Sequence, residues 1–362
     1  MFRIIFTSDY EIHGNGEGSP MDLIVEPTSR MMDLFDKYSA KLTVMADYAE
    51  IFKFKEYYDK TGSDDFYYKP ILEQLKYAVS NGHDIQLHVH PSYFKANYKN
   101  GSWDQNYDEY DLSQLDQKRL NDVIKTGKSF LESELKPMKS DYNCFVFRAA
   151  NWSMQPSFNI VKALVDNNIF IDTSVFKYGW RDELVKFDYS EAHSDLIPWP
   201  VDVNDICKKD LNGKLFEIPI YCENMPITTF ITINRIYRVI LGQLHNLEKR
   251  SSDPSPEEKK TKIERIKSLI YKINFVFRKH AWKMDFNQCT GKQLIKGLKR
   301  AEAKYKQVNV DLPFVLIGHS KLFSKRNEKT LQPFLEFVSQ NSDRFVFSTF
   351  KDINLEKYRY NI

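Results

Sequence analysis

The chain has 362 residues, 42% of them hydrophobic and 28% charged, with a formal net charge of +3 at pH 7. This composition is typical of a soluble globular protein with one large domain or two ordinary ones. Four widely spaced cysteines without a CxxC pair argue against a disulfide framework or a zinc ribbon and fit a reducing compartment. The N-terminal MFRIIFTSDYE has no long apolar core, so we expect no signal peptide, no membrane-spanning segment and a cytoplasmic location.

Short apolar runs alternate with helical patterns along the chain. The predicted strands are residues 3–9, 40–47, 84–90, 145–150, 170–176, 217–220, 313–320 and 344–350. The predicted helices are residues 27–38, 69–82, 112–135, 156–168 and 330–339. Strands that are apolar on both faces and alternate with helices are typical of a parallel sheet or barrel. With about seven or eight such units, we predict an α/β fold, specifically a distorted (β/α) barrel.

One segment, residues 225–307, departs from this alternation. It reads as helical and basic, with 19 Lys and Arg against 7 Asp and Glu between Arg235 and Lys306. We predict a basic helical insertion within a single domain that spans residues 1–362. The insertion could be a solvated hairpin, could hold an anionic substrate, or could contact the inner face of a membrane peripherally. Nothing in it resembles a module that binds nucleic acid.

Several polar residues stand where predicted strands end. Asp9, His90, Arg148, Asp172 and His319 each close an apolar run. In parallel barrels the chemistry lies at the carboxyl ends of the strands. The sequence therefore predicts that these side chains share one site.

The stretch HDIQLHVHP at 83–91 places two histidines on one face of a strand, because residues i and i+2 project the same way. His88 and His90 could be two ligands of one divalent metal, or two polar residues at a strand end. Asp9 and Glu11 form a similar i, i+2 pair in TSDYE. One carboxylate with two imidazoles is the composition of a catalytic zinc site, and a second carboxylate could serve as the general base of a hydrolysis. Arg148 could hold either carboxylate by a bidentate bond.

Five motifs occur in the order, and with the separations, of a known family: TSDYE at 7–11, GHDIQLHVHP at 82–91, FRAANWSMQP at 147–156, DTSVF at 172–176 and IGHSK at 317–321. In these the chain resembles the polysaccharide deacetylase (NodB-like, carbohydrate esterase 4) superfamily, and within it the divergent members that begin with a D-Y-E strand. The resemblance spans nearly the whole chain.

The resemblance implies a metal-dependent N-deacetylase on a distorted (β/α)7 barrel. It implies that the first motif supplies a base and a ligand, that Arg148 orients the base, and that His319 is the general acid, oriented by Asp172. Two departures bear on the ligands: Tyr10 replaces a second aspartate, and the histidines are two apart rather than four. Either Asp9 binds the metal and Glu11 is the base, or the reverse.

Because its shorter side chain is more rigid, Asp9 is preferred as the ligand, which gives Asp9, His88 and His90 as the metal set. The metal is expected to be Zn²⁺, with Co²⁺, Ni²⁺ or Mn²⁺ as alternatives. Tyr93 and Trp152 are candidates for contact with substrate.

The expected reaction removes an N-acetyl group from an N-acetylated sugar or polysaccharide, free or lipid- or nucleotide-linked, in surface polysaccharide biosynthesis. Two alternatives remain. One is an inactive carbohydrate-binding barrel, and the other is a glycoside hydrolase that uses Asp9 and Glu11 as its two carboxylates.

Overall fold

The computed structural model describes residues 1–12, 14, 16–237 and 278–360. Its central element is a ten-stranded sheet with the order β11-β10-β12-β7-β6-β3-β2-β1-β15, in which β16 also pairs with β1. The strands are β1 (Phe2–Tyr10), β2 (Leu42–Asp47), β3 (Asp84–Val89), β6 (Val146–Ala149), β7 (Ile171–Asp172), β10 (Trp199–Asp202), β11 (Asp205–Lys209), β12 (Phe216–Glu217), β15 (Leu312–His319) and β16 (Phe345–Phe347). Neighbouring strands are parallel, except that β10 pairs antiparallel with β11 and β12.

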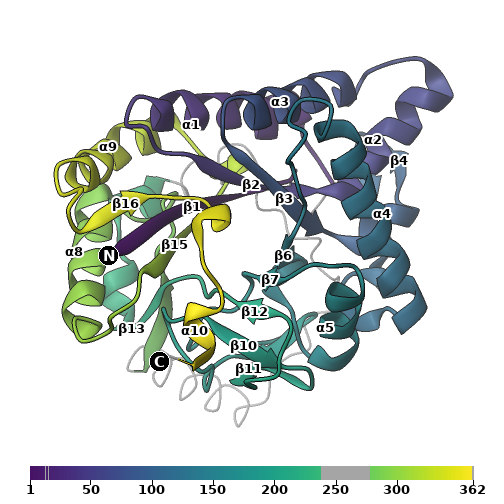
Figure 1. Ribbon diagram of the computed structural model, residues 1–362. Coiled ribbons are helices and arrows are strands. Elements are labelled where there is room, and N and C mark those ends of the chain that lie inside the picture. The colour runs from purple at the N-terminus through teal and green to yellow at the C-terminus, as the bar shows by residue number, and fades with distance from the viewer. Residues whose placement is uncertain (13, 15, 238–277, 361–362) are drawn as a thin grey trace, which may run out of the picture.

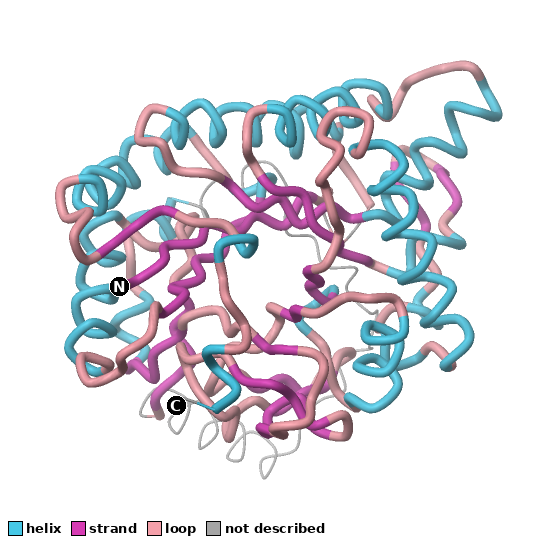
Figure 2. Tube along the Cα trace, in the orientation of Figure 1, coloured by secondary structure: helices cyan, strands magenta, loops and turns pink. Residues whose placement is uncertain are grey.

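The sheet curves until its two sides meet. Just after β12, Ile220 forms a parallel bridge with Val315 of β15, and Asp285 forms a second bridge with Ile317. The Tyr221 N–H donates a hydrogen bond to the Val315 carbonyl at 3.1 Å. Figures 1 and 2 show the resulting ring of strands with the helices outside it.

The outer helices are α1 (Glu26–Asp36), α2 (Tyr48–Thr61), α3 (Tyr68–Ser80), α4 (Gln117–Leu135), α5 (Ser157–Asp166), α8 (Gly291–Lys304), α9 (Lys325–Ser339) and the short α10 (Lys357–Tyr360). Helix α2 was not predicted, although its ends carry clear signals. The Asp47 side chain accepts from the Ala49 N–H at the N-terminus, and Gly62 adopts a φ of 73° at the C-terminus. Its aromatic and charged residues alternate too closely for an apolar stripe to stand out. None of the helices in the described ranges combines the length and the apolar character needed to cross a bilayer.

The core lies between the sheet and the helices. Every residue of β2 and β3 is buried, as expected for strands covered on both faces. The ring of Phe6 packs against Phe35, Phe286 and Phe334, with centroids 4.4, 5.8 and 6.0 Å away. Aromatic packing around Phe6 thus helps to hold β1, the strand that leads to Asp9 and Glu11, in place.

The mixed α/β fold with a curved, mainly parallel sheet agrees with the predicted fold class, but it does not reduce to seven regular units. β10 and β11 form an antiparallel pair at one edge, and β16 branches from β1. β7 and β12 have two residues each, so they are shorter than the predicted strands 170–176 and 217–220.

The predicted insertion, 225–307, falls partly outside the described residues. Within the described part, β13 (Cys222–Pro226) pairs antiparallel with β14 (Lys279–Lys283), and α8 packs against α9. Since Asp285 bridges to β15, the chain after β14 belongs to the barrel wall. The predicted helical run across 238–277 lies outside the described residues. Two further hairpins are β4 (Asn97–Lys99) with β5 (Ser102–Asp104), and β8 (Trp180–Asp182) with β9 (Lys186–Asp188).

Candidate metal centre

The carboxyl ends of five strands bring together Asp47 and four of the predicted polar residues. In the sheet register, Asp9 of β1 lies opposite His319 of β15. His88 of β3 lies opposite Asp47 of β2 on one side and Arg148 of β6 on the other. Because parallel strands all end at the same edge, the five side chains share one rim of the barrel.

Glu11, His88 and His90 form a cluster at this rim whose ligand atoms all lie within 4.8 Å of one another. Glu11 Oε2 is 3.1 Å from His88 Nε2 and 2.6 Å from His90 Nε2. The two imidazole centroids are 5.0 Å apart, which fits an i, i+2 pair on one strand face. Glu11 and His88 are buried, while the side chain of His90 is 13% exposed, so the cluster opens to solvent on the His90 side.

The composition and orientation of the cluster fit a divalent cation. One carboxylate and two imidazoles are the three protein ligands of a catalytic zinc-type site, which keeps a position open. His88 Nδ1 lies 2.8 Å from the Arg148 backbone carbonyl, so it can donate there and leave Nε2 as the ligand atom. Such an outer hydrogen bond is what fixes a metal-binding imidazole in its working tautomer.

The charges around the cluster favour a bound cation. Burial would raise the pKa of the Glu11 carboxyl, but Lys321 and the two histidines hold it well below its usual range. Burial disfavours the charged form of His88, yet the hydrogen bond to Glu11 and the charges of Asp9, Glu11 and Asp47 raise its pKa to about 9. The cluster therefore attracts positive charge, which a proton or a metal ion can supply.

Asp9 is not part of this cluster. Its Oδ1 accepts a hydrogen bond from Arg148 Nη1 at 2.7 Å, and its Oδ2 lies 3.5 Å from His319 Nε2. Burial raises the pKa of Asp9, but the charges of Arg148 and His319 lower it below its usual value. Of the two arrangements left open by the sequence, the geometry matches Glu11 beside the histidines. The rigidity of the shorter side chain had favoured Asp9 as the ligand. Glu11, however, lies just after the end of β1, and its longer side chain reaches both imidazoles.

His319 lies beside Asp9, but no contact joins it to Asp172 among the described residues. Its Nδ1 is buried and has no hydrogen-bond partner there. Asp172 instead accepts hydrogen bonds from the N–H and the hydroxyl of Ser174, at 3.1 and 2.8 Å. Burial raises the pKa of Asp172 and also that of the neighbouring Glu217. The expected support of His319 by Asp172 is absent from this geometry, since both oxygens of Asp172 face Ser174.

Trp152 and Tyr93, both predicted to contact substrate, differ in position. Trp152 is partly exposed, and its ring lies edge-on to His319 with centroids 6.0 Å apart. Trp152 and Asn151 both have a positive φ, 58° and 54°, a conformation that is costly for residues other than glycine. Tyr93 is 1% exposed, and burial followed by the charge of Glu50 raises its pKa well above the usual value. The structure therefore leaves Tyr93 no surface for a substrate.

Three residues near the site were given no role from the sequence. Asp47 ends β2, and its Oδ1 accepts from the His90 backbone N–H at 3.1 Å. Lys321 donates to Glu11 Oε1 at 2.7 Å. The strand-end and i, i+2 patterns that identified the other residues would have identified both. Lys283 lacked such a signal, because its segment reads as helical although it forms β14.

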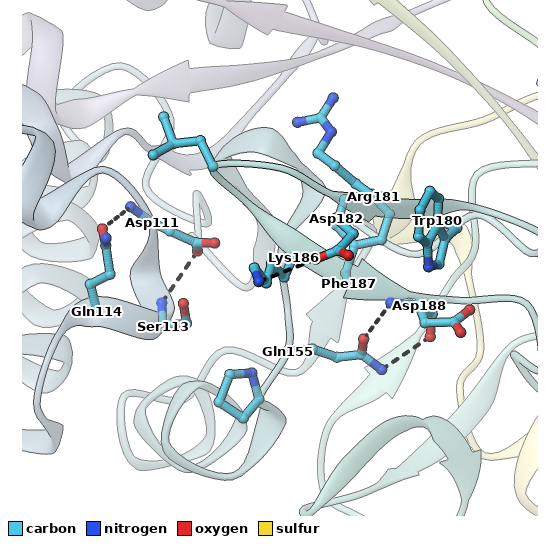
Figure 3. Close-up of a pocket in the computed structure, with 12 residues that line it drawn as sticks. Asp111, Ser113, Gln114, Gln155, Trp180, Arg181, Asp182, Lys186, Phe187 and Asp188 are labelled. Carbon is cyan, nitrogen blue, oxygen red and sulfur yellow. Dashed lines mark hydrogen bonds and ion pairs between the residues drawn. The ribbon is translucent and has the colours of Figure 1, made fainter. Parts of the chain in front are cut away.

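The structure also has a pocket of about 550 Å³ whose lining includes none of the cluster residues. The β8–β9 hairpin forms one wall, and residues 111–114 and 155–156 form the other (Figure 3). Arg181 lines this pocket, and its guanidinium also lies 5.8 Å from the centre of the Trp152 ring. Arg181 thus links the pocket to Trp152, whose ring lies edge-on to His319.

No protein-family model matches the sequence, and no curated protein is similar enough to count as a match. Solved structures do resemble the fold. A GH57-type branching enzyme from the hyperthermophilic archaeon Pyrococcus horikoshii gives a TM-score of 0.50 at 9% identity, covering 97% of this chain and 70% of that one. At this identity the likeness concerns the fold alone.

Two further structures are similar at lower scores. A protein described as a polysaccharide deacetylase from Mycobacterium smegmatis gives a TM-score of 0.48 at 12% identity, covering 99% of this chain and 90% of that one. A family 4 acetyl xylan esterase from Clostridium thermocellum, solved with a cobalt ion, gives 0.28 at 15% identity, covering 49% and 59%. Likeness at this level does not extend to chemistry.

Proposed function

We propose that this protein is a metal-dependent hydrolase that removes the N-acetyl group from an N-acetylated sugar. One observation carries the proposal: the Glu11, His88 and His90 cluster lies at the same rim as a second buried carboxylate, Asp9, and the histidine next to it. The motif resemblance described above supports the same reaction class.

The proposed roles follow from the contacts of each side chain. Glu11, His88 and His90 would hold the cation, and His90 is the ligand nearest to solvent. The chemistry supplied by a bound divalent ion is Lewis acidity, which polarises an amide carbonyl and lowers the pKa of a water.

Asp9 is the proposed general base. Arg148 engages Oδ1 and leaves Oδ2 to take a proton from the attacking water. Burial lowers the pKa of His319, so we propose that its Nε2, 3.5 Å from Asp9 Oδ2, receives this proton and passes it to the amide nitrogen as the C–N bond breaks. The new C–O bond yields acetate, and the sugar leaves as a free amine.

The two alternatives fit the site less well. A glycoside hydrolase needs two carboxylates free to face a sugar ring, but Glu11 Oε1 is bonded to Lys321 and Oε2 faces two histidines. An inactive binding barrel would have no need for three ligand atoms gathered within 4.8 Å. Its test is the metal content of the purified protein.

The proposal is tested by acetate release from N-acetylglucosamine oligomers after loading with Zn²⁺, Co²⁺, Ni²⁺ or Mn²⁺. We expect acetate and free amine in equal amounts, no new reducing ends, and loss of activity with a chelator. New reducing ends without acetate would indicate a glycoside hydrolase. Saccharide binding with neither product nor metal would indicate the inactive barrel. We also propose that the protein acts in a surface polysaccharide pathway, in the cytoplasm, with a peripheral contact to the inner membrane. The identity of the substrate tests the pathway.

A further inference from the structure

Two cationic side chains, Lys283 and Arg181, contact aromatic rings near Asp9, the proposed general base. Lys283 Nζ lies 3.3 Å from the centre of the Trp152 ring and 4.3 Å from that of Phe176. The Arg181 guanidinium lies 5.8 Å from the ring centres of both Trp152 and Phe187. The faces of aromatic rings attract cations and hold them in a defined place.

Neither cation forms an ion pair with a carboxylate in the part of the chain that the structure describes. Asp182 of the pocket pairs with Lys186 at 3.2 Å, and Asp188 accepts from the Ser190 N–H at 2.9 Å. In Figure 3 the guanidinium of Arg181 points away from the Asp182–Lys186 pair. Among the described residues, none of the carboxylates that line the pocket forms an ion pair with Arg181.

The position of Lys283 is electrostatically unfavourable without a further anion. Burial, together with the charge of Arg181, lowers its pKa to about 8, although Asp285 and Asp9 oppose the shift. Asp285 is itself engaged, because it accepts hydrogen bonds from the Asn287 N–H at 2.8 Å and from the Gln288 side chain at 2.6 Å. Two like charges that interact in a partly desolvated place favour binding of an anion close to both.

These cations stand next to the proposed site of reaction. Trp152 contacts both of them and also lies edge-on to His319. Its indole N–H is buried and has no hydrogen-bond partner among the described residues. The Trp152 carbonyl accepts a hydrogen bond from the Tyr189 hydroxyl at 2.5 Å, which holds this segment in place. The adjoining pocket of about 550 Å³ is within the size range of sites for small ligands.

We propose that Lys283, Arg181 and the Trp152 ring form a subsite for an anionic group of the substrate, so that the substrate is an acidic N-acetylated saccharide. The acidic group is a carboxylate or a phosphate on the sugar next to the acetamide or on its carrier. Arg181 can bind either group with two N–H donors, while the Trp152 ring holds Lys283 in place beside it. This inference rests on the proposed function only in calling the bound saccharide a substrate. Binding of the acidic saccharide itself does not require turnover.

Equilibrium binding is the test, measured on the metal-loaded Asp9→Asn protein so that no ligand is consumed. The first ligand is an oligosaccharide of alternating N-acetylglucosamine and glucuronate, and its neutral control is the same oligosaccharide with reduced carboxyl groups. Uridine diphosphate N-acetylglucosamine, compared with N-acetylglucosamine, tests a phosphate source. We expect at least one acidic ligand to bind about tenfold more tightly than its neutral control, and less so at high ionic strength.

The variants assign this preference to residues. Arg181→Met and Lys283→Met should each reduce the preference several-fold, while Lys186→Met, which removes a pocket lysine that is already paired, should keep it. Arg181 is partly exposed, so its replacement tests the subsite even if Lys283→Met fails to fold. Equal binding of acidic and neutral ligands in both pairs would overturn the subsite, as would an equal loss in Lys186→Met.

Acetate release separates this inference from the proposed function. A charge preference without acetate from any ligand contradicts the deacetylase and leaves the subsite standing. Acetate released equally well from acidic and neutral oligosaccharides, with equal affinities, contradicts the subsite and leaves the deacetylase standing.

Discussion

The guanidinium of Arg148 lies 2.7 Å from a carboxylate oxygen of Asp9, and neither side chain is more than 3% exposed. Each charge therefore depends on the other, because water cannot replace the lost partner. Arg148 also donates through Nε to the Thr173 carbonyl at 2.9 Å, so the pair ties β1 and β6 to the chain after β7. The contact that positions the proposed base is at the same time part of the fold.

Replacing Arg148 with Met should lower the free energy of unfolding by about 3–5 kcal/mol at neutral pH, since it leaves the Asp9 charge buried and unpaired. Because Arg148 holds the pKa of Asp9 down, the loss should be smaller at acid pH, where Asp9 becomes protonated. Urea denaturation measures both effects. The double variant Arg148→Met/Asp9→Asn should recover much of the loss. If the double variant is no more stable than the single one, the pair is not what stabilises this region.

Glu11→Gln and Asp9→Asn separate the ligand from the base. Glu11→Gln should weaken binding of the metal by at least about 10–100-fold, as measured by competition with a chelator, because the loss of an outer partner alone has that effect. Asp9→Asn should keep the metal and reduce acetate release by about 10²–10⁴-fold, the usual contribution of a general base. The opposite pattern, with metal lost only in Asp9→Asn, would restore Asp9 as the ligand.

Gly318 precedes His319 on β15, and a Cβ atom there would lie 2.2 Å from the Phe286 ring. Gly318→Ala should therefore cost about 1–3 kcal/mol of stability through overpacking and should displace His319. Thermal unfolding and acetate release measure the two effects. Gly14 is the matched control, since nothing lies within 4 Å of its Cβ position and Gly14→Ala should unfold like the unchanged protein. An unchanged melting temperature in Gly318→Ala would contradict the packing argument.

Lys283 gives a pH-dependent effect on stability. In the unfolded chain a lysine keeps its proton up to about pH 10.4, whereas the pKa of Lys283 in the folded chain is about 8. Between these values the unfolded chain binds more protons, so the contribution of Lys283 to the unfolding free energy rises with pH. Burial is the main cause of this low pKa; Asp285, Cys222 and Asp9 oppose the shift, and Arg181 adds to it.

Lys283→Met should thus be more stable than the unchanged protein near pH 7, and the difference should shrink as the pH approaches about 10. Denaturant unfolding at several pH values gives the comparison. Lys186→Met, which removes a lysine paired with Asp182 at the surface, should show no such convergence. A pH-independent difference would mean that Lys283 is not desolvated.

The order of the longer parallel strands along the chain could be predicted because each of them leaves a local pattern, whereas β10 and β11 were not predicted. The run 84–90 alternates Ile85, Leu87 and Val89 with polar residues, and the structure has β3 at Asp84–Val89. Strands β7 and β12 were harder, because two-residue strands are defined by their neighbours in the sheet rather than by their own sequence. Strand β14 was missed for a related reason: a basic segment can form a hairpin edge as well as a helix, and only its pairing with β13 decides.

The site was predictable to the extent that its residues end strands. Parallel register alone places Asp9 beside His319 and His88 beside Arg148. Whether Asp9 or Glu11 approaches the histidines depends on where β1 stops and on the length of the side chain. Both are properties of the folded rim that spacing does not encode. The contact between Lys283 and Trp152 joins residues 131 positions apart in the numbering, so no local pattern could reveal it.

The register of β13 and β14 has a consequence for the chain that joins them. Met225 and His280 face each other across the hairpin, so the chain leaves the barrel and returns to it at adjacent points. Closing a connection of any length costs little extra free energy when its two ends are held together. The β13–β14 hydrogen bonds therefore fix where the connecting chain departs from the barrel wall and where it rejoins it, independently of how many residues lie between.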